Sequence, residues 1–269
     1  MAKLLMVTGI GSAKDLAFGK KGAFYNTLEE FSKHWDRIDI ICPKLTNNSR
    51  PIINSLFGNV FLHISPWPLI FHPLWFLKRG IQIYKEQKFD LMTVHEFPPF
   101  YNGIGARLLW NKIRVPYILE FHHISGYPRA ANLKEKIYAL PILWQIYWNI
   151  FGSKTEAVRV VNQKQTPEFL KKIGVPENKI YYIPSMYIDF SVFKPTTNDR
   201  QPMTKEYDLI FVGRLEVNKG IDLLLEAAKK FKIQNSKFKI LIVGDGSLRK
   251  NYELRIKNYE IGNNVKMWG

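Results

Sequence analysis

Short apolar runs alternate with longer stretches of helical spacing along almost the whole chain. This alternation predicts repeated strand–helix units around a mainly parallel sheet, and therefore an α/β fold. The predicted strands are residues 3–8, 38–41, 59–63, 91–94, 117–121, 157–161 and 180–183. The predicted helices between them are residues 22–34, 74–87, 99–112, 133–151 and 165–173.

A polar stretch with turn-forming residues interrupts the alternation after residue 194. It predicts an N-terminal domain at 1–194, a linker at 195–205 and a second, partial domain at 206–269. A length of 269 residues fits two domains. In the second domain we expect strands at 207–212, 239–243 and 265–268, and helices at 220–231 and 248–259. Such a small unit buries little surface, so we expect it either to dock on the first domain or to continue beyond Gly269.

The single cysteine, Cys42, excludes an intrachain disulfide framework and a cysteine-rich metal site, and a reducing compartment fits best. The start of the chain lacks a convincing leader cleavage site. Prolines and polar residues interrupt the apolar stretches 64–77 and 138–152, so we expect no membrane span. These features favour a cytoplasmic protein, and a location at the inner face of the membrane is compatible with them.

The formal charge of +16 would attract phosphates, nucleic acid or an anionic membrane surface. Since the sequence contains no recognisable nucleic-acid-binding motif, we expect no nucleic-acid partner, although a basic α/β binder stays an alternative. Aromatic and basic residues gather at 67–85, and Trp144, Tyr147 and Trp148 follow further along. They indicate either peripheral membrane contact or buried helices.

The segment from Phe211 to Asp222 is the most informative in the sequence. An apolar strand ends at Gly213, and a loop with Arg214 and Lys219 leads into an amphipathic helix. Ligands of open parallel sheets bind beyond the carboxyl ends of the strands, and two cations there suit a diphosphate. The alternative is an ordinary strand-to-helix turn with solvated charges.

From this segment to Gly269 the chain resembles the family 4 retaining glycosyltransferases of GT-B fold, which have two Rossmann-like parallel-sheet domains. The resemblance implies a nucleotide-sugar donor bound in a cleft, retention of anomeric configuration, and no other cofactor and no metal. It also implies that Gly213, Arg214 and Lys219 bind the donor, and that the two cations stabilise the leaving diphosphate. In relatives, two glutamates seven residues apart lie beyond the point matching Gly269, so we expect the second domain to be incomplete here.

The first domain resembles the family more loosely. Residues 89–95 and 115–123 look like two successive strands that end at the cleft with histidines. The position of His122 lies near the donor sugar in relatives, where a histidine can hydrogen-bond a hydroxyl or a phosphate. His123 is the alternative, because a register error of one residue would exchange the two. For His95 we favour a structural role.

Glycines follow two of the predicted strands. Gly9 and Gly11 come after the first strand and could let backbone N–H groups approach the donor or the acceptor. We expect residues 13–21 to form a longer loop. The turn at residues 244–246 is interpreted as structural, because glycines ease the passage from strand to helix.

Residues 183–189 resemble the interdomain turn of the family, with Ser185 and Met186 in place of the usual Asn and Gly. The function that the sequence favours is transfer of a sugar to an acceptor, and a lipid-linked or cell-surface glycan is the kind of acceptor that we expect. The main alternative is a non-catalytic or split transferase that binds a sugar, a lipid or a partner chain completing the second domain.

Overall fold

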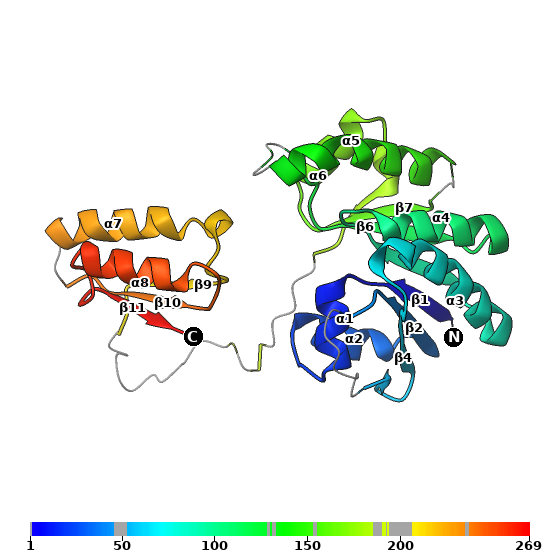
Figure 1. The fold of residues 1–269 in the computed structure, drawn as a ribbon, viewed down its shortest axis with the longest axis horizontal. Helices are drawn as coiled ribbons and strands as arrows, with labels where there is room; N and C mark the ends of the chain where they lie inside the picture. Colours follow the sequence, from blue (N-terminus) through cyan, green and yellow to red (C-terminus); the bar gives the residue numbers. More distant parts are fainter. Residues whose placement is uncertain are drawn as a thin grey trace. The chain divides into compact units, whose positions relative to one another are not determined.

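The computed structural model describes residues 2–45, 53–127, 130, 133–152, 155–184, 190, 191, 193, 206–234 and 237–269. The chain forms two compact units, Met1–Phe190 and Ser191–Gly269, which we describe separately (Figure 1). The predicted linker at 195–205 and the turn residues 185–189 lie outside the described residues.

The first unit is built on a mainly parallel sheet with the strand order β3-β4-β2-β1-β5-β6-β7-β8. Of the strands in the described residues, β3 alone runs antiparallel to its neighbour, β4. The strands are β1 (Lys3–Val7), β2 (Arg37–Cys42), β3 (Ser55–Leu56), β4 (Val60–Ile64), β5 (Leu91–His95), β6 (Tyr117–Phe121), β7 (Ala157–Val160) and β8 (Ile180–Tyr182). The order reverses between β1 and β5, which makes this pair the topological switch point of the sheet.

Helices cover both faces of this sheet (Figure 1). On one face, α1 (Ile10–Ala17) and α2 (Ala23–Ser32) pack over β1, β2 and β4. On the other face lie α3 (His72–Gln87), α4 (Tyr101–Ile113), α5 (Leu133–Tyr147), its π-helical continuation η2 (Trp148–Gly152) and α6 (Gln165–Lys172). Single 3₁₀ turns, η1 (Leu69–Phe71) and η3 (Glu177–Lys179), complete the unit.

The side-chain alternation of β6 shows how the sequence sets the two faces. Tyr117, Leu119 and Phe121 point into the helix-covered core and are at most 1% exposed, whereas Glu120 points to the opposite face.

Close contact between α3 and α4 depends on two glycines. A Cβ atom at Gly105 would lie 2.2 Å from Cδ1 of Phe76, and one at Gly80 would lie 2.4 Å from Cδ2 of Leu109.

A charged network lies between β2, β4 and α3. The Asp39 carboxylate accepts hydrogen bonds from Arg37 (Nε, 2.9 Å) and Gln87, and its Oδ1 lies 2.6 Å from Nε2 of His63. Arg79 donates to Nδ1 of the same histidine at 3.2 Å. Burial alone would raise the pKa of Asp39, but the contacts with His63 and Arg37 lower it below the usual value. The paired charges therefore stay satisfied inside the unit.

The predicted α/β fold with a parallel sheet is confirmed, and the predicted strands of the first unit lie within two residues of the observed ones. The predicted loop at 13–21 is wrong. Residues 10–17 form α1, because Ala13, Leu16 and Ala17 repeat at helical spacing and are buried against the sheet. The two-residue strand β3 was not predicted.

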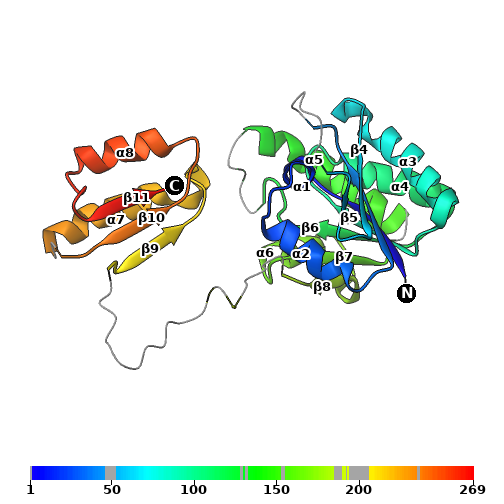
Figure 2. The ribbon, with the colours of Figure 1, turned by 90° about the horizontal axis from the view of Figure 1, so that it is seen from below.

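The second unit has a three-stranded parallel sheet, in the order β11-β10-β9, with β9 at Leu209–Val212, β10 at Ile240–Val243 and β11 at Val265–Trp268. The 3₁₀ turn η4 (Val217–Lys219) precedes α7 (Ile221–Gln234), and α8 (Arg249–Asn258) follows β10. Both helices cover one face of this sheet; Figure 2, seen from below, shows the strands in front of α7. The other face carries exposed apolar side chains, including Val212 (74% exposed) and Trp268 (63%).

Candidate functional site

Glycine main chain forms the carboxyl edge of the second sheet. Gly213, Gly244 and Gly269 directly follow β9, β10 and β11. A Cβ atom at Gly244 would lie 2.0 Å from the carbonyl oxygen of Gly213, and one at Gly269 would lie 2.5 Å from that of Gly244. Gly244 and Gly269 also have φ of 145°, which strains other residues. The three strand ends therefore form a platform of bare backbone at the edge where parallel sheets bind ligands.

Arg214 and Lys219 both lie in the connection between β9 and α7, as the sequence predicts. Both side chains are exposed. Gly220, with φ of 70°, ends the 3₁₀ turn and leads into α7. Within the described part of the chain, neither charged group forms an ion pair or a hydrogen bond. Two cations beside a backbone platform can contact an incoming anion without first breaking a contact of their own.

The loop that carries Arg214 is fixed to the next strand–helix connection. Leu215 is fully buried, its N–H donates to the carbonyl of Asp245 at 3.0 Å, and its own carbonyl accepts from the N–H of Leu248 at 3.2 Å. The hydroxyl of Ser247 donates to the Glu216 carboxylate at 3.1 Å. Glu216 and Ser247 were not predicted from the sequence, because their pairing spans 31 residues and depends on the tertiary fold.

In the first unit, polar side chains follow one another across the ends of β5, β6 and β7. The strand register places His95 beside Glu120, and Glu120 beside Arg159. The guanidinium of Arg159 donates to Glu120 at 2.9 Å and to the carbonyls of Ile183 and Pro184 at 3.2 Å each. These side chains point away from the face covered by α4, α5 and α6. No local sequence pattern indicates Arg159, which the sheet register brings to this place.

Two histidines stack at the same edge. The ring centroids of His95 and His122 are 4.2 Å apart, with 26° between the ring planes. Burial lowers the pKa of His95 to about 3, helped by His122, His123 and Arg159, and burial and Arg159 also lower the pKa of His122. Both rings are therefore neutral hydrogen-bonding groups near pH 7. His123 is exposed, and the structure places His122 in the stack.

The switch point between β1 and β5 lies beside this pair. Gly9 caps the start of α1, and a Cβ atom there would lie 3.4 Å from Cε1 of Phe97, which follows β5. Asn102 donates to the carbonyls of His95 (2.8 Å) and Thr8 (3.5 Å), and so joins the two strand ends. Gly11 lies in the first turn of α1, so the glycine-rich loop expected here is a helix start.

Glu96 is an acid of the first unit with a raised pKa that the sequence did not single out. Its side chain is buried (2% exposed), and one carboxyl oxygen accepts from the N–H of Phe97 at 3.2 Å. The other oxygen has no partner in the described part of the chain. Burial raises the pKa of this carboxyl to about 8. A neutral acid next to the switch point can donate a hydrogen bond that a carboxylate could not.

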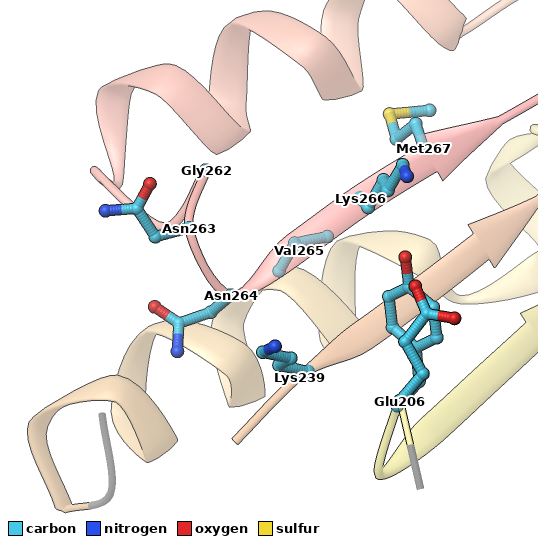
Figure 3. A pocket seen from close by; sticks show the side chains of 9 residues that line it. Glu206, Lys239, Gly262, Asn263, Asn264, Val265, Lys266 and Met267 are labelled. Carbon is cyan, nitrogen blue, oxygen red and sulfur yellow. The ribbon is translucent and has the colours of Figure 1, made fainter. Parts of the chain in front are cut away.

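A hollow of about 380 Å³ lies elsewhere on the second unit (Figure 3). Its lining includes Glu206, Lys239, Asn263, Asn264 and Lys266, at the amino-terminal ends of β10 and β11. This end of the sheet is opposite to Arg214 and Lys219, so we do not assign the hollow to the donor.

In the described residues, no three His, Cys, Asp or Glu side chains gather as metal ligands would.

Comparison with known proteins gives the family. A model of the Glycosyltransferase Family 4 matches residues 23–186, more than half of the chain, and a model of the Glycosyl transferases group 1 matches residues 194–269. The chain belongs to glycosyltransferase family 4. Two relatives of this family 4 chain are the uncharacterized glycosyltransferases MJ1059 and MJ1178 of Methanocaldococcus jannaschii, at 24% and 23% identity over 75% and 78% of the chain.

The family 4 chain spans about half the length of these curated relatives, 51% and 52%. Among solved structures, a glycosyltransferase from Rickettsia africae is similar over 100% of this chain and 68% of its own, with a TM-score of 0.62 at 17% identity. The apo form of the lipopolysaccharide outer core galactosyltransferase WaaB is similar over 99% and 68%, with a TM-score of 0.57 at 14% identity. Together with the family models, these neighbours confirm the GT-B type of fold.

In the part of the family 4 chain that the structure describes, no helix has both the length and the apolar character to cross a bilayer.

Proposed function

We propose that the chain takes part in transferring a sugar from a nucleotide-sugar donor to an acceptor, with retention of anomeric configuration. The observation that carries this proposal is the pair of exposed cations, Arg214 and Lys219, beside a backbone platform at the ligand-binding edge of the second sheet. An anion that binds there meets both main-chain dipoles and point charges. A leaving diphosphate is such an anion, and it gains charge as the anomeric bond breaks.

In this proposal the guanidinium of Arg214 binds phosphate oxygens in a bidentate way, and Lys219 supplies a compact charge. The loop needs no rearrangement to present Arg214, since buried Leu215 and the contact of Glu216 with Ser247 already fix it. Gly213 and Gly244 keep the strand ends free of side chains, so that a ligand can approach the backbone.

The role proposed for His122 is a hydrogen bond to a sugar hydroxyl or a phosphate oxygen. Support comes from its place at the carboxyl edge of the first sheet and from the lowered pKa, which keeps the ring neutral and able to accept as well as donate. Stacking on His95 restricts its orientation. Gly9, at the switch point of the same sheet, is the backbone position that we propose for donor or acceptor contact; Gly11, within α1, is a weaker candidate.

Neighbours of the same fold give further support for a nucleotide-sugar donor and a glycan acceptor. A structure of TarM from Staphylococcus aureus, with a TM-score of 0.52, is a complex with fondaparinux, α-GlcNAc-glycerol and UDP. Another neighbour is described as a putative UDP-N-acetylglucosamine 2-epimerase from Listeria monocytogenes, with a TM-score of 0.53 at 11% identity. One fold can serve both chemistries, so the fold alone does not favour transfer over epimerisation. The two family models do favour transfer.

We further propose that the acceptor is a lipid-linked or cell-surface glycan, that the chain acts in the cytoplasm at the inner membrane face, and that further polypeptide completes the second domain. The apolar outer face of the second sheet, with Val212 and Trp268 exposed, supports the last point.

The test is release of nucleoside diphosphate from a panel of sugar nucleotides in the presence of a crude glycolipid extract. The parent is compared with the double variant Arg214→Ala/Lys219→Ala, and the matched control is Lys250→Ala/Lys257→Ala, which removes two exposed lysines from α8. We expect release by the parent and the control, loss of about a hundredfold or more in the variant, and a product whose anomeric proton coupling matches the donor. Calorimetric binding of UDP and GDP runs in parallel. Equal binding and equal release by the variant and the control would refute the proposal.

A further inference from the structure

Helix α5 and its continuation η2 are apolar on two sides. Ile146 and Ile150 point into the core of the first unit and are at most 3% exposed. On the outer side lie Leu133 (71% exposed), Ile137 (61%), Trp144 (67%), Tyr147 (58%) and Phe151 (43%). These five residues, which we call the α5 surface, follow one another at helical spacing and form one stripe.

The composition of this segment is that of a buried helix. Residues 137–153 contain no charged side chain. A helix that is apolar all round is normally enclosed by apolar neighbours, yet its outer stripe is open in the described structure. A hollow of about 320 Å³ lies on the stripe, lined by Leu143, Trp144, Tyr147, Phe151 and, from the end of α6, Ile173. Among the residues that the structure describes, none therefore forms an apolar covering over the α5 surface.

The exposed side chains are of the kind found where hydrocarbon meets water. The rings of Trp144 and Trp148 stack with centroids 6.3 Å apart and 24° between planes, and Tyr147 lies 5.2 Å from Phe151. Trp and Tyr combine a large apolar ring with a polar N–H or O–H group, so they are favoured at the level of lipid headgroups. Burying several such rings contributes more than isolated aliphatic contacts would.

Basic residues border the α5 surface. Lys136 on α5 and Lys172 at the end of α6 are exposed, and the guanidinium of Arg107 lies 5.4 Å from the ring centroid of Trp148. Residues 101–184 carry twelve lysines and arginines against five acidic residues. Charge of this sign beside an aromatic stripe complements an anionic lipid surface.

The other aromatic segment suggested by the sequence, residues 67–85, is a poorer candidate. Phe76 is fully buried, Trp75 and Tyr84 pack against the core, and Arg79 donates to His63. Most of α3 is thus explained by packing inside the unit. The exposed large apolar side chains of this segment are confined to its start, at Ile70 (65% exposed), Phe71 (50%) and Leu74 (51%).

We propose that the α5 surface docks on the surface of a bilayer containing anionic lipid, with α5 lying in the interface and its tryptophan and tyrosine rings among the headgroups. The basic border supplies long-range attraction, and the rings supply the short-range apolar contact. This inference stands on exposure and charge alone and does not depend on the donor site.

The experiment measures sedimentation of the full chain with vesicles of phosphatidylcholine alone and with 30 mol% phosphatidylglycerol. We compare the parent with Trp144→Ser/Tyr147→Ser and with Lys136→Glu/Lys172→Glu. Phe31→Ser, which changes an exposed aromatic residue on α2 (40% exposed), is the matched control. Circular dichroism and thermal unfolding show whether each variant is folded. Because the substituted side chains are exposed, we expect unfolding temperatures close to that of the parent.

We expect the parent and Phe31→Ser to bind anionic vesicles at least about tenfold more tightly than the aromatic double variant. The lysine variant should lose binding to anionic vesicles, while its weak binding to phosphatidylcholine should equal that of the parent. Added salt should likewise weaken the binding of the parent to anionic vesicles. Failure of the parent to bind anionic vesicles overturns the proposal. So does equal binding by the aromatic variant, or a self-association of the parent that the aromatic variant abolishes, since that would make the α5 surface a protein interface.

Discussion

The imidazole of His122 stacks on the imidazole of His95, with ring centroids 4.2 Å apart. His95 is the last residue of β5 and His122 directly follows the neighbouring parallel strand β6, so the sheet brings the two residues to the same edge. Burial lowers the pKa of His95 to about 3, so its imidazole is uncharged at neutral pH. It supports the ring of His122 and adds no positive charge next to it.

The stack predicts that substitutions of the adjacent residues His122 and His123 have different effects on kcat. His122→Ala should lower kcat of sugar transfer by about tenfold to a hundredfold, the cost of one hydrogen bond to a reacting sugar or phosphate. His123→Ala, at the exposed neighbour, should leave kcat within about twofold of the parent. Initial rates at saturating donor measure both. A larger loss in His123→Ala than in His122→Ala would contradict the assignment.

Acid should destabilise the first unit partly through His95. The folded pKa of about 3 lies below the unfolded value of 6.5, so this group contributes stability above pH 6.5 that is lost as the pH falls towards 3. The loss amounts to at most about 1.4 kcal/mol per pH unit within that window. In His95→Gln the difference in unfolding free energy between pH 7 and pH 5 should therefore shrink. Urea unfolding at both pH values measures it, and an unchanged difference would show that His95 does not titrate as described.

Glu96 should have the opposite pH dependence. Its folded pKa of about 8 lies above the unfolded value of 4.5, so its contribution to stability falls as the pH rises from 4.5 to 8. Glu96→Gln keeps a neutral group of similar shape and removes this loss. We expect the variant to gain more stability relative to the parent at pH 8 than at pH 5, by about 1 kcal/mol or more. Thermal unfolding of the variant and the parent at the two pH values measures this gain. An equal stability difference between variant and parent at pH 5 and pH 8 would contradict the raised pKa of Glu96.

Gly244→Ala should be severely destabilising. Its Cβ atom would meet the carbonyl oxygen of Gly213 at 2.0 Å in a backbone conformation with φ of 145°. We expect a loss of at least about 3 kcal/mol of unfolding free energy, or no folded second unit. Gly262→Ala is the control, because nothing lies within 4 Å of its Cβ position. Similar stability of the two variants would mean that the strand ends are not packed as described.

The contact between Glu216 and Ser247 predicts a positioning effect on the anion site. Ser247→Ala removes the hydroxyl that donates to Glu216 and should weaken nucleoside diphosphate binding about fivefold, while the unfolding temperature stays close to that of the parent. Ser247→Thr keeps a hydroxyl and should restore most of the affinity. Calorimetry with UDP and GDP measures the change. Weakened binding in both variants alike would assign the effect to packing.

The periodicity of the sequence was sufficient for both parallel sheets, because each strand leaves a short apolar run between segments of helical spacing. It was also sufficient for the loop of Arg214 and Lys219, where the strand end and the helix start are both local signals. Helix α1 was missed because Gly9 and Gly11 suggested a loop, whereas burial of Leu16 against the sheet stabilises the helix. Arg159, Glu96 and Ser247 could not be found, since each depends on contacts between distant parts of the chain.

The platform of Gly213, Gly244 and Gly269 presents main chain and hardly any side chain to whatever binds at that edge. Its shape is therefore set by the positions of three strand ends and not by the chemistry of the residues around them. Substitutions elsewhere in the second unit can accumulate without changing the surface that a ligand meets, provided that these three positions keep hydrogen as their side chain. Such a surface tolerates sequence drift well, and selectivity for one ligand over another must come from neighbouring groups that do vary.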